Sequence, residues 1–227
     1  MKNLLLFLSI LASSLTSTVG QSFNVAELSK LYDVKIHTSG LRAGIWTGET
    51  TIEVFRKRSK RPLQTMRLPH TYINADGIKL ATVGDKKKGV WSNVYLADLN
   101  FDGHEDLAVA DGLDGGYSAI SYTIYRYVPR SGRFVRDARL TRLAHGPYMG
   151  IPEPDYGRRT LSVFSKSGCC MHYQEMYRVS GTRVSKIEEV NDYYDSPSDP
   201  GYEVIETKKL TRGRWRTFVK KKRITEN

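Results

Sequence analysis

Apolar and polar residues alternate with a period of two along most of this chain, and turn-forming residues interrupt the alternation at short intervals. Such alternation places side chains on opposite faces of a β-strand, whereas an amphipathic helix repeats about every 3.6 residues. The 14 tyrosines add to the preference for strands. The pattern predicts strands at Tyr32–His37, Thr50–Arg56, Leu63–Leu68, Ile78–Val83, Val94–Asp98, Asp106–Asp111, Tyr117–Val128, Arg133–Arg136, Arg159–Ser165, His172–Val179, Arg183–Val190, Tyr202–Lys209 and Arg214–Lys221.

The most regular of these segments is Tyr117–Val128, in which both alternating faces carry apolar side chains. A strand that is apolar on both faces is expected in the interior of the fold. Short turns predict hairpins at Arg130–Gly132, Ser180–Thr182 and Arg212–Gly213. Together these features predict a single, mostly β domain, built as an antiparallel β-sandwich or an irregular barrel.

The first 20 residues have the organisation of a secretory signal peptide. Lys2 supplies the positive charge, Leu4–Leu11 form the apolar stretch, and small residues up to Gly20 fit cleavage before Gln21. The apolar stretch is too short for a membrane-spanning helix, and no Cys follows it for attachment of a lipid. We therefore expect a periplasmic or secreted protein with no membrane anchor.

The rest of the chain divides by pattern into two parts. Residues 21–44 are expected to form an N-terminal extension, with a short helix over residues 21–31 that Asn24 caps. Residues 45–224 carry the regular alternation and are expected to form the β domain.

The chain is basic, with a formal net charge of +11, to which the signal peptide contributes only Lys2. Positive charge steers acidic partners, although a charge run is also compatible with a merely solvated surface. The sequence contains no nucleic-acid-binding module, and export argues against a nucleic acid as the partner. An anionic polymer of the cell envelope is a possible partner for the basic runs, which are Arg56–Arg61, Lys86–Lys88 and Lys220–Arg223.

The two cysteines, Cys169 and Cys170, are adjacent. Neighbouring Cα atoms lie about 3.8 Å apart, whereas disulfides usually join Cα atoms about 4.4–6.8 Å apart. A disulfide here would be strained and easily reduced. The alternatives are two buried thiols or, with His172, a metal cluster, although zinc sites usually space their cysteines further apart.

One short segment predicts a metal site. Asp98 begins a nine-residue stretch in which oxygen-bearing residues recur at alternate positions. Calcium prefers six to eight oxygen ligands, and a tight loop supplies them at this spacing. Gly103 permits the sharp turn, and Glu105 is expected to point away from the ion. The predicted Ca²⁺ ligands are Asp98, Asn100, Asp102, the carbonyl of His104, and Asp106.

This loop differs from that of a helical EF-hand. Val109 stands where the EF-hand has its bidentate Glu, and strand-like segments flank the loop in place of helices. The spacing therefore predicts a strand–loop–strand site of modest affinity, to which Asp111 or Asp114 could add a ligand. Clustered aspartates repel one another without an ion, so calcium is expected to stabilise the fold and to take no part in chemistry.

The segment from Asp98 to Leu107 resembles the FG-GAP type of calcium loop, best known from the β-propellers of integrin α chains. A propeller repeats its blade, and this motif occurs once. Residues 45–220 resemble bacterial periplasmic proteins related to the inhibitors of invertebrate-type lysozyme, some of which act as immunity proteins against peptidoglycan hydrolases delivered by type IV secretion. The matching segments are Thr51–Phe55, Leu63–Gln64, the calcium loop, Tyr122–Tyr127, Ser131–Val135, Leu140–Leu143, Ser167–Gly168, Tyr173–Tyr177 and Val179–Val184.

The resemblance implies a β-sandwich inhibitor that inserts a loop into the active-site cleft of a peptidoglycan hydrolase. Family inhibitors use a loop that carries Ser, Gly and Tyr, and the matching residues here are Gly115, Gly116, Tyr117 and Ser118, with Ser165–His172 as a second candidate. An ordinary hairpin turn remains the alternative at both places. Because animal lysozymes are usually basic, as is this chain, an acidic hydrolase is the expected target.

Two other classes of function remain open. A calcium-stabilised module that binds an anionic envelope polysaccharide would use the basic runs and would need no protein target. An enzyme is not expected, since the chain has no nucleophile elbow and no zinc-protease motif. The pair Glu153 and Asp155 could imitate a hydrolase's carboxylates, but only a defined separation would make them catalytic.

Overall fold

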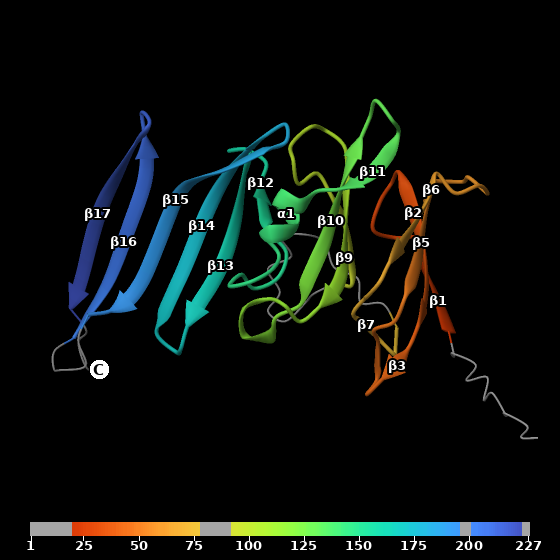
Figure 1. Cartoon of the computed structure of the whole chain (residues 1–227). Coiled ribbons are helices and arrows are strands. Elements are labelled where there is room, and N and C mark those ends of the chain that lie inside the picture. The colour runs from red at the N-terminus through yellow and green to blue at the C-terminus, as the bar shows by residue number, and fades with distance from the viewer. Residues whose placement is uncertain (1–19, 78–91, 196–200, 224–227) are drawn as a thin grey trace, which may run out of the picture.

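The computed structural model of this chain describes residues 20–77, 92–195 and 201–223, and these residues are arranged mainly in antiparallel sheets (Figure 1). The N-terminal sheet has the order β1 (Gly20–Val25), β2 (Tyr32–Ser39), β5 (Thr50–Arg56) and β6 (Gln64–Leu68). The central sheet has the order β11 (Arg133–Arg136), β10 (Ser121–Val128), β9 (Asp106–Gly112) and β8 (Val94–Ala97).

The C-terminal sheet has the order β12 (Glu153–Asp155), β13 (Thr160–Ser167), β14 (Met171–Ser180), β15 (Arg183–Tyr194), β16 (Tyr202–Thr211) and β17 (Arg214–Arg223). A small sheet joins β3 (Leu41–Arg42), β4 (Ile45–Trp46) and β7 (Ile73–Asn74). A 3₁₀ turn, η1 (Gly116–Ser118), lies between β9 and β10, and a short helix, α1 (Ala138–Arg142), follows β11.

The central sheet is buried on both faces, as its sequence requires. Leu107 and Val109 pack into a core shared with the N-terminal sheet, whereas Ala108 and Ala110 pack into a second core with α1 and the C-terminal sheet. These four neighbours in β9 are all fully buried. Because successive strand residues face opposite ways, an uninterrupted apolar run fits only a strand covered on both sides. The three sheets therefore form layers, with the central sheet in the middle (Figure 1).

The predicted fold class is confirmed, because the described chain is mostly β and its sheets are antiparallel. The barrel alternative is wrong, since none of the sheets in the described segments closes on itself. The predicted interior strand is confirmed as β10, which lies between β9 and β11, although it begins at Ser121 rather than at Tyr117. All three predicted hairpins form. The strand predicted at Ile78–Val83 lies outside the described residues.

The helix predicted over residues 21–31 is wrong. Residues 20–25 form β1, which pairs with β2 from Gly20 opposite Ser39 to Val25 opposite Val34. Val25 is buried and Phe23 packs against the same core, so burial of an alternating face outweighs a weak helical propensity. The segment 21–44 therefore contributes two strands to a sheet completed by β5 and β6 and does not stand apart from it. The predicted signal peptide, residues 1–19 in particular, lies outside the described residues.

No helix in the described segments is long and apolar enough to cross a membrane.

Leu107→Ala tests the double-sided burial of the central sheet. Removing a fully buried Leu side chain leaves a cavity, and we expect the free energy of unfolding to fall by about 2–5 kcal/mol in denaturant titrations. Leu113→Ala is the matched control, because this leucine is 43% exposed in the loop after β9. Equal losses of stability in the two variants would contradict the layered core.

Candidate functional site

The predicted calcium loop joins β8 to β9, as the sequence analysis expected. The two strands pair up to Ala97 opposite Asp106, so the loop closes a hairpin of the central sheet. Phe101 and Gly103 have φ angles of 60° and 87°. Gly103 thus occupies the sharp turn that the sequence predicts for it, since glycine adopts a left-handed conformation without steric cost.

The side-chain oxygens of the loop are turned inward by its own backbone. Asp98 accepts hydrogen bonds from the N–H groups of Asp102 (3.1 Å) and Gly103 (2.8 Å). Asn100 Oδ1 accepts from Asp102 N (2.9 Å), and Asp102 Oδ1 accepts from His104 N (3.0 Å). Each oxygen that accepts one hydrogen bond retains a further lone pair. Asp98, Asn100 and Asp102 are therefore held along the inner side of one tight turn.

Asp106 is the only member of this set that is a fully buried carboxyl group. Its oxygens accept hydrogen bonds from Tyr127 N (2.9 Å) and Leu99 N (3.0 Å), and thus tie the loop to β10. Burial raises the pKa of Asp106 to about 8, against the lowering effect of these two hydrogen bonds, and the nearby Asp102 and Asp98 raise it further. Without a cation, burial and the neighbouring aspartates thus favour the protonated form of the Asp106 carboxyl group.

The donor set suits a hard cation, since every expected ligand is an oxygen. Glu105 points away as expected, because its carboxylate accepts a hydrogen bond from the Ser29 hydroxyl. Asp111, which could add a ligand, has a carboxylate that accepts hydrogen bonds from both Ser121 and Thr123. Among the described residues, no group of three or more His, Cys, Asp or Glu side chains is positioned to hold a metal ion. An ion would therefore have to draw Asp98, Asp102 and Asp106 together.

The second candidate feature is the turn of Gly115, Gly116, Tyr117 and Ser118 between β9 and β10. Tyr117 and Ser118 both have φ near 55°, which is unusual for residues other than glycine. A Cβ on Gly116 would lie 2.3 Å from the carbonyl oxygen of Pro147, and one on Gly115 would lie 2.7 Å from that of Ala119. The turn is thus pressed against a neighbouring loop, and such strained turns cluster at binding sites.

The turn presents Tyr117 to solvent and also fixes its position. The Tyr117 side chain is 60% exposed, yet its hydroxyl accepts a hydrogen bond from Gly168 N, and Lys166 Nζ lies 4.8 Å from the centre of its ring. Gly168 and Lys166 belong to the β13–β14 hairpin. The two segments that the sequence analysis named as alternative partner loops therefore lie in contact and form one surface, which we call the Tyr117 ridge (Gly115–Ser118 and Ser165–His172).

The adjacent cysteines form a disulfide at the tip of the β13–β14 hairpin. Their Cα atoms are 3.8 Å apart, and Cys169 is exposed. The alternative of two buried thiols is therefore wrong. A metal cluster with His172 is also wrong for this state, because the sulfur atoms are bonded to each other.

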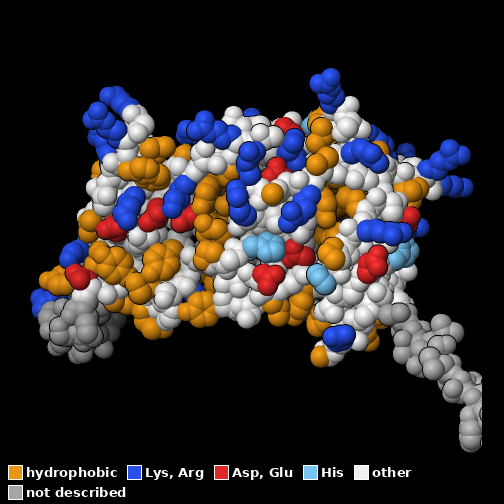
Figure 2. Space-filling view, in the orientation of Figure 1, with side chains coloured by type: hydrophobic (Ala, Val, Ile, Leu, Met, Phe, Trp, Pro, Cys, Tyr) orange, Lys and Arg blue, Asp and Glu red, His pale blue; other side chains and the backbone are white. Residues whose placement is uncertain are grey.

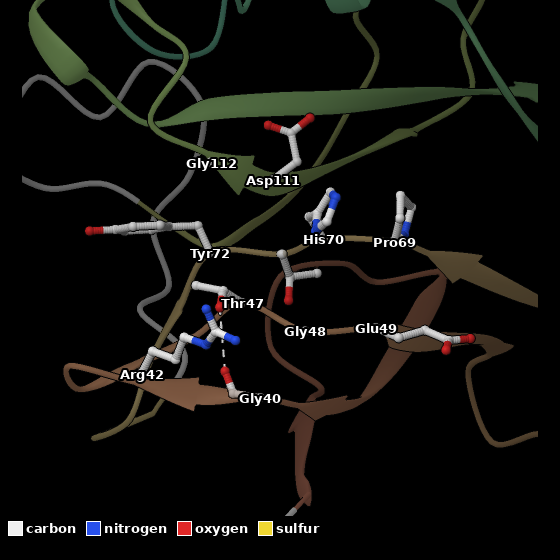
Figure 3. A pocket seen from close by; sticks show the side chains of 11 residues that line it. Gly40, Arg42, Thr47, Gly48, Glu49, Pro69, His70, Tyr72, Asp111 and Gly112 are labelled. Carbon is white, nitrogen blue, oxygen red and sulfur yellow. Dashed lines mark hydrogen bonds between the residues drawn. The ribbon is translucent and has the colours of Figure 1, made fainter. Parts of the chain in front are cut away.

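A cleft of about 540 Å³ lies between the N-terminal and central sheets (Figure 3). His70 and Asp111 line it, but the carboxylate of Asp111 is directed to β10, where Ser121 and Thr123 bind it. His145 also binds this carboxylate, at 3.1 Å from Asp111 Oδ2. The Ser121 hydroxyl group donates its hydrogen bond to Asp111 and not to a histidine. These groups therefore do not form the nucleophile–base pair of a hydrolase.

Comparison with known proteins gives one similar fold. No family model matches the chain, and no curated protein matches it. A solved structure described as a Xanthomonas type IV secretion system related protein has 20% sequence identity and a TM-score of 0.66, over 88% of this chain and 99% of the other. At this identity the similarity concerns the fold. The class defined by fold and site is thus a layered, antiparallel β protein that shares its fold with a type IV secretion system related protein.

Gly116→Ala tests the packing of the Tyr117 ridge. The added methyl group would displace the Pro147 carbonyl, and we expect a loss of about 1–3 kcal/mol in the free energy of unfolding. Gly112→Ala is the control, because its methyl group would meet its nearest neighbour at 3.5 Å, which is ordinary van der Waals contact. If both variants unfold at the same denaturant concentration, the close approach at Gly116 does not determine the conformation of the turn.

Proposed function

We propose that this protein is an exported inhibitor or immunity protein that blocks a peptidoglycan hydrolase by inserting the Tyr117 ridge into its active-site cleft. The observation that carries the proposal is the exposed Tyr117. It follows two glycines on a strained turn, and its hydroxyl group is bound by the β13–β14 hairpin. Tyrosine is enriched among the residues that dominate binding energy at interfaces. A side chain already fixed in place loses little conformational freedom on binding.

The charge of the ridge suits such a target. Glycoside hydrolases generally place two carboxyl groups on either side of the bond that they cleave. Lys166, which lies over the ring of Tyr117, brings a positive charge to the same surface. A ridge with a cation beside an aromatic side chain is complementary in sign to a cleft with two carboxylates. Basic side chains are also widespread over the face in Figure 2, which favours an acidic hydrolase as the target.

The calcium loop has a structural role in this proposal. Ca²⁺ would bind Asp98, Asn100, Asp102, the His104 carbonyl and Asp106. Its positive charge would compensate the negative charge of the buried Asp106 carboxylate. Because Asp106 also binds the backbone of β10, the ion would fix the sheet that ends at the Tyr117 turn. The fold shared with a type IV secretion system related protein is consistent with a role in competition or defence at the cell envelope.

Tyr117→Ala tests the inhibitor proposal. The mature chain, residues 21–227, would be used in calcium to capture proteins from envelope extracts of the source organism and of rival strains. We expect a salt-resistant hydrolase whose lytic activity falls on addition of the protein. Loss of an interface anchor of about 2 kcal/mol would weaken this binding about thirtyfold in the variant.

Tyr194→Ala is the matched control, since Tyr194 is 53% exposed at the end of β15 and outside the ridge. It should inhibit as well as the unaltered protein. Recovery of only salt-labile envelope polymer, with no hydrolase, would overturn the proposal and favour a polysaccharide-binding module.

Asp102→Ala tests the calcium proposal. For the unaltered protein, calcium at about 100 times its dissociation constant should add about 2.7 kcal/mol to the free energy of unfolding, relative to protein treated with EDTA. The variant should lose this calcium-dependent difference, whereas Asp76→Ala, which removes an exposed carboxylate outside the loop, should keep it. An identical thermal midpoint of the unaltered protein in calcium and in EDTA would contradict calcium binding.

A further inference from the structure

The outer strand of the C-terminal sheet has the features of a second binding surface. β17 occupies one end of the strand order, so one side of its backbone has no neighbouring strand in the described structure. All ten of its residues are exposed, and it pairs with β16 over its full length without a bulge. Edge strands of soluble proteins are usually short, bulged or covered, because unpaired backbone groups attract other strands. β17 is long, regular and open, so its side chains decide which strands the edge can accept.

The side chains of β17 show which strands this edge would accept. Six of them are basic and none is acidic: Arg214, Arg216, Lys220, Lys221, Lys222 and Arg223. Lys221 is paired with Asp195 (2.6 Å), and the other five have no ion-pair partner among the described residues. The same strand exposes about half of each of its large apolar side chains, Trp215, Phe218 and Val219. Basic and hydrophobic side chains lie together at the left end of Figure 2, over β16 and β17.

A second copy of this chain does not fit the edge. Antiparallel pairing of two β17 strands about their centre would place Arg214 opposite Arg223 and Arg216 opposite Lys221. Like charges directly opposite each other destabilise a strand pair. Basic residues on an edge are one of the means by which proteins prevent self-association. The same charges favour a strand of opposite sign.

The open backbone edge of β17 favours an extended polypeptide over a flat anionic surface or a polymer. Side chains alternate between the two faces of a strand. Arg214, Arg216, Lys220 and Lys222 therefore lie on one face, whereas Lys221 and Arg223 lie on the other. Four of the five unpaired cations thus share one face, which a surface or a polymer could also contact, but only an added strand would also pair with the open backbone groups of the edge.

We propose that β17 binds an extended acidic segment of a partner protein, which adds to the C-terminal sheet as a further antiparallel strand. Backbone hydrogen bonds along β17 supply the affinity common to such complexes. Asp or Glu side chains of the segment pair with the unpaired cations, and its apolar side chains cover Trp215 and Val219 on the opposite face. This surface is separate from the Tyr117 ridge, so the two proposals can fail independently.

Binding of labelled peptides to the mature chain tests the proposal by fluorescence anisotropy. The probes are a peptide of about ten residues that alternates Glu with Val, a version with Lys in place of Glu, and a version of the acidic peptide N-methylated at alternate residues along its pairing edge. We expect saturable binding of the unmodified acidic peptide, with at least tenfold weaker binding of the other two. N-methylation preserves the charge and removes the backbone donors, so equal binding of the methylated peptide would overturn strand addition.

A pair of double variants locates the site. Lys220→Glu with Lys222→Glu reverses two charges of β17 and should weaken the acidic peptide at least tenfold. Lys60→Glu with Arg61→Glu makes the same change of net charge at exposed positions in the turn after β5 and should leave binding unchanged. No saturable binding of the acidic peptide to the unaltered chain, or equal weakening by both double variants, would overturn the proposal.

Discussion

The structure depends on the burial of one carboxyl group, that of Asp106, between the β8–β9 loop and β10. Its oxygens accept hydrogen bonds from the N–H groups of Leu99 and Tyr127, so a single side chain joins the β8–β9 loop to β10. A buried carboxylate without a counter-charge is costly, which is why its pKa is raised to about 8. A bound cation would reverse this balance by favouring the ionised form, and it would displace a proton on binding. If the loop binds a cation as proposed, loop order, cation affinity and pH would be coupled at this one residue.

Close contact between backbones, rather than burial of large side chains, determines the shape of the Tyr117 ridge. Gly116 lies where any larger residue would meet the Pro147 carbonyl, and the next residue, Tyr117, has a left-handed conformation. Within the ridge, the hydrogen bond from Gly168 joins the Gly115–Ser118 turn to the β13–β14 hairpin, whose tip contains the Cys169–Cys170 disulfide. Tyr117, which is 60% exposed, is thus supported by closely packed backbone, an arrangement that suits recognition of a preformed cleft.

Local patterns in the sequence predicted most of the strands, because alternation and turn residues report local structure directly. They did not predict which sheets stack, since that depends on contacts between distant strands such as β9 and β13. The short helix α1 was also missed. Asp137 caps it by accepting hydrogen bonds from the N–H groups of Arg139 and Leu140, and an Asp at this position is a sequence signal for the start of a helix. The spacing of Asp98 to Asp106 predicted the loop correctly, but no local pattern could indicate that the two candidate partner segments meet at Tyr117 and Gly168.

The positive charge of the chain has different consequences at the Tyr117 ridge and along β17. Near the Tyr117 ridge, Lys166 is held over an aromatic ring, so its charge is directed at whatever Tyr117 contacts. Along β17 most of the charges instead lie on one face beside an open edge, where they oppose pairing with an identical strand and favour an acidic one. Net charge alone would predict only a general attraction to anions. The arrangement of the cations on a defined turn and on a defined strand is what distinguishes one acidic partner from another.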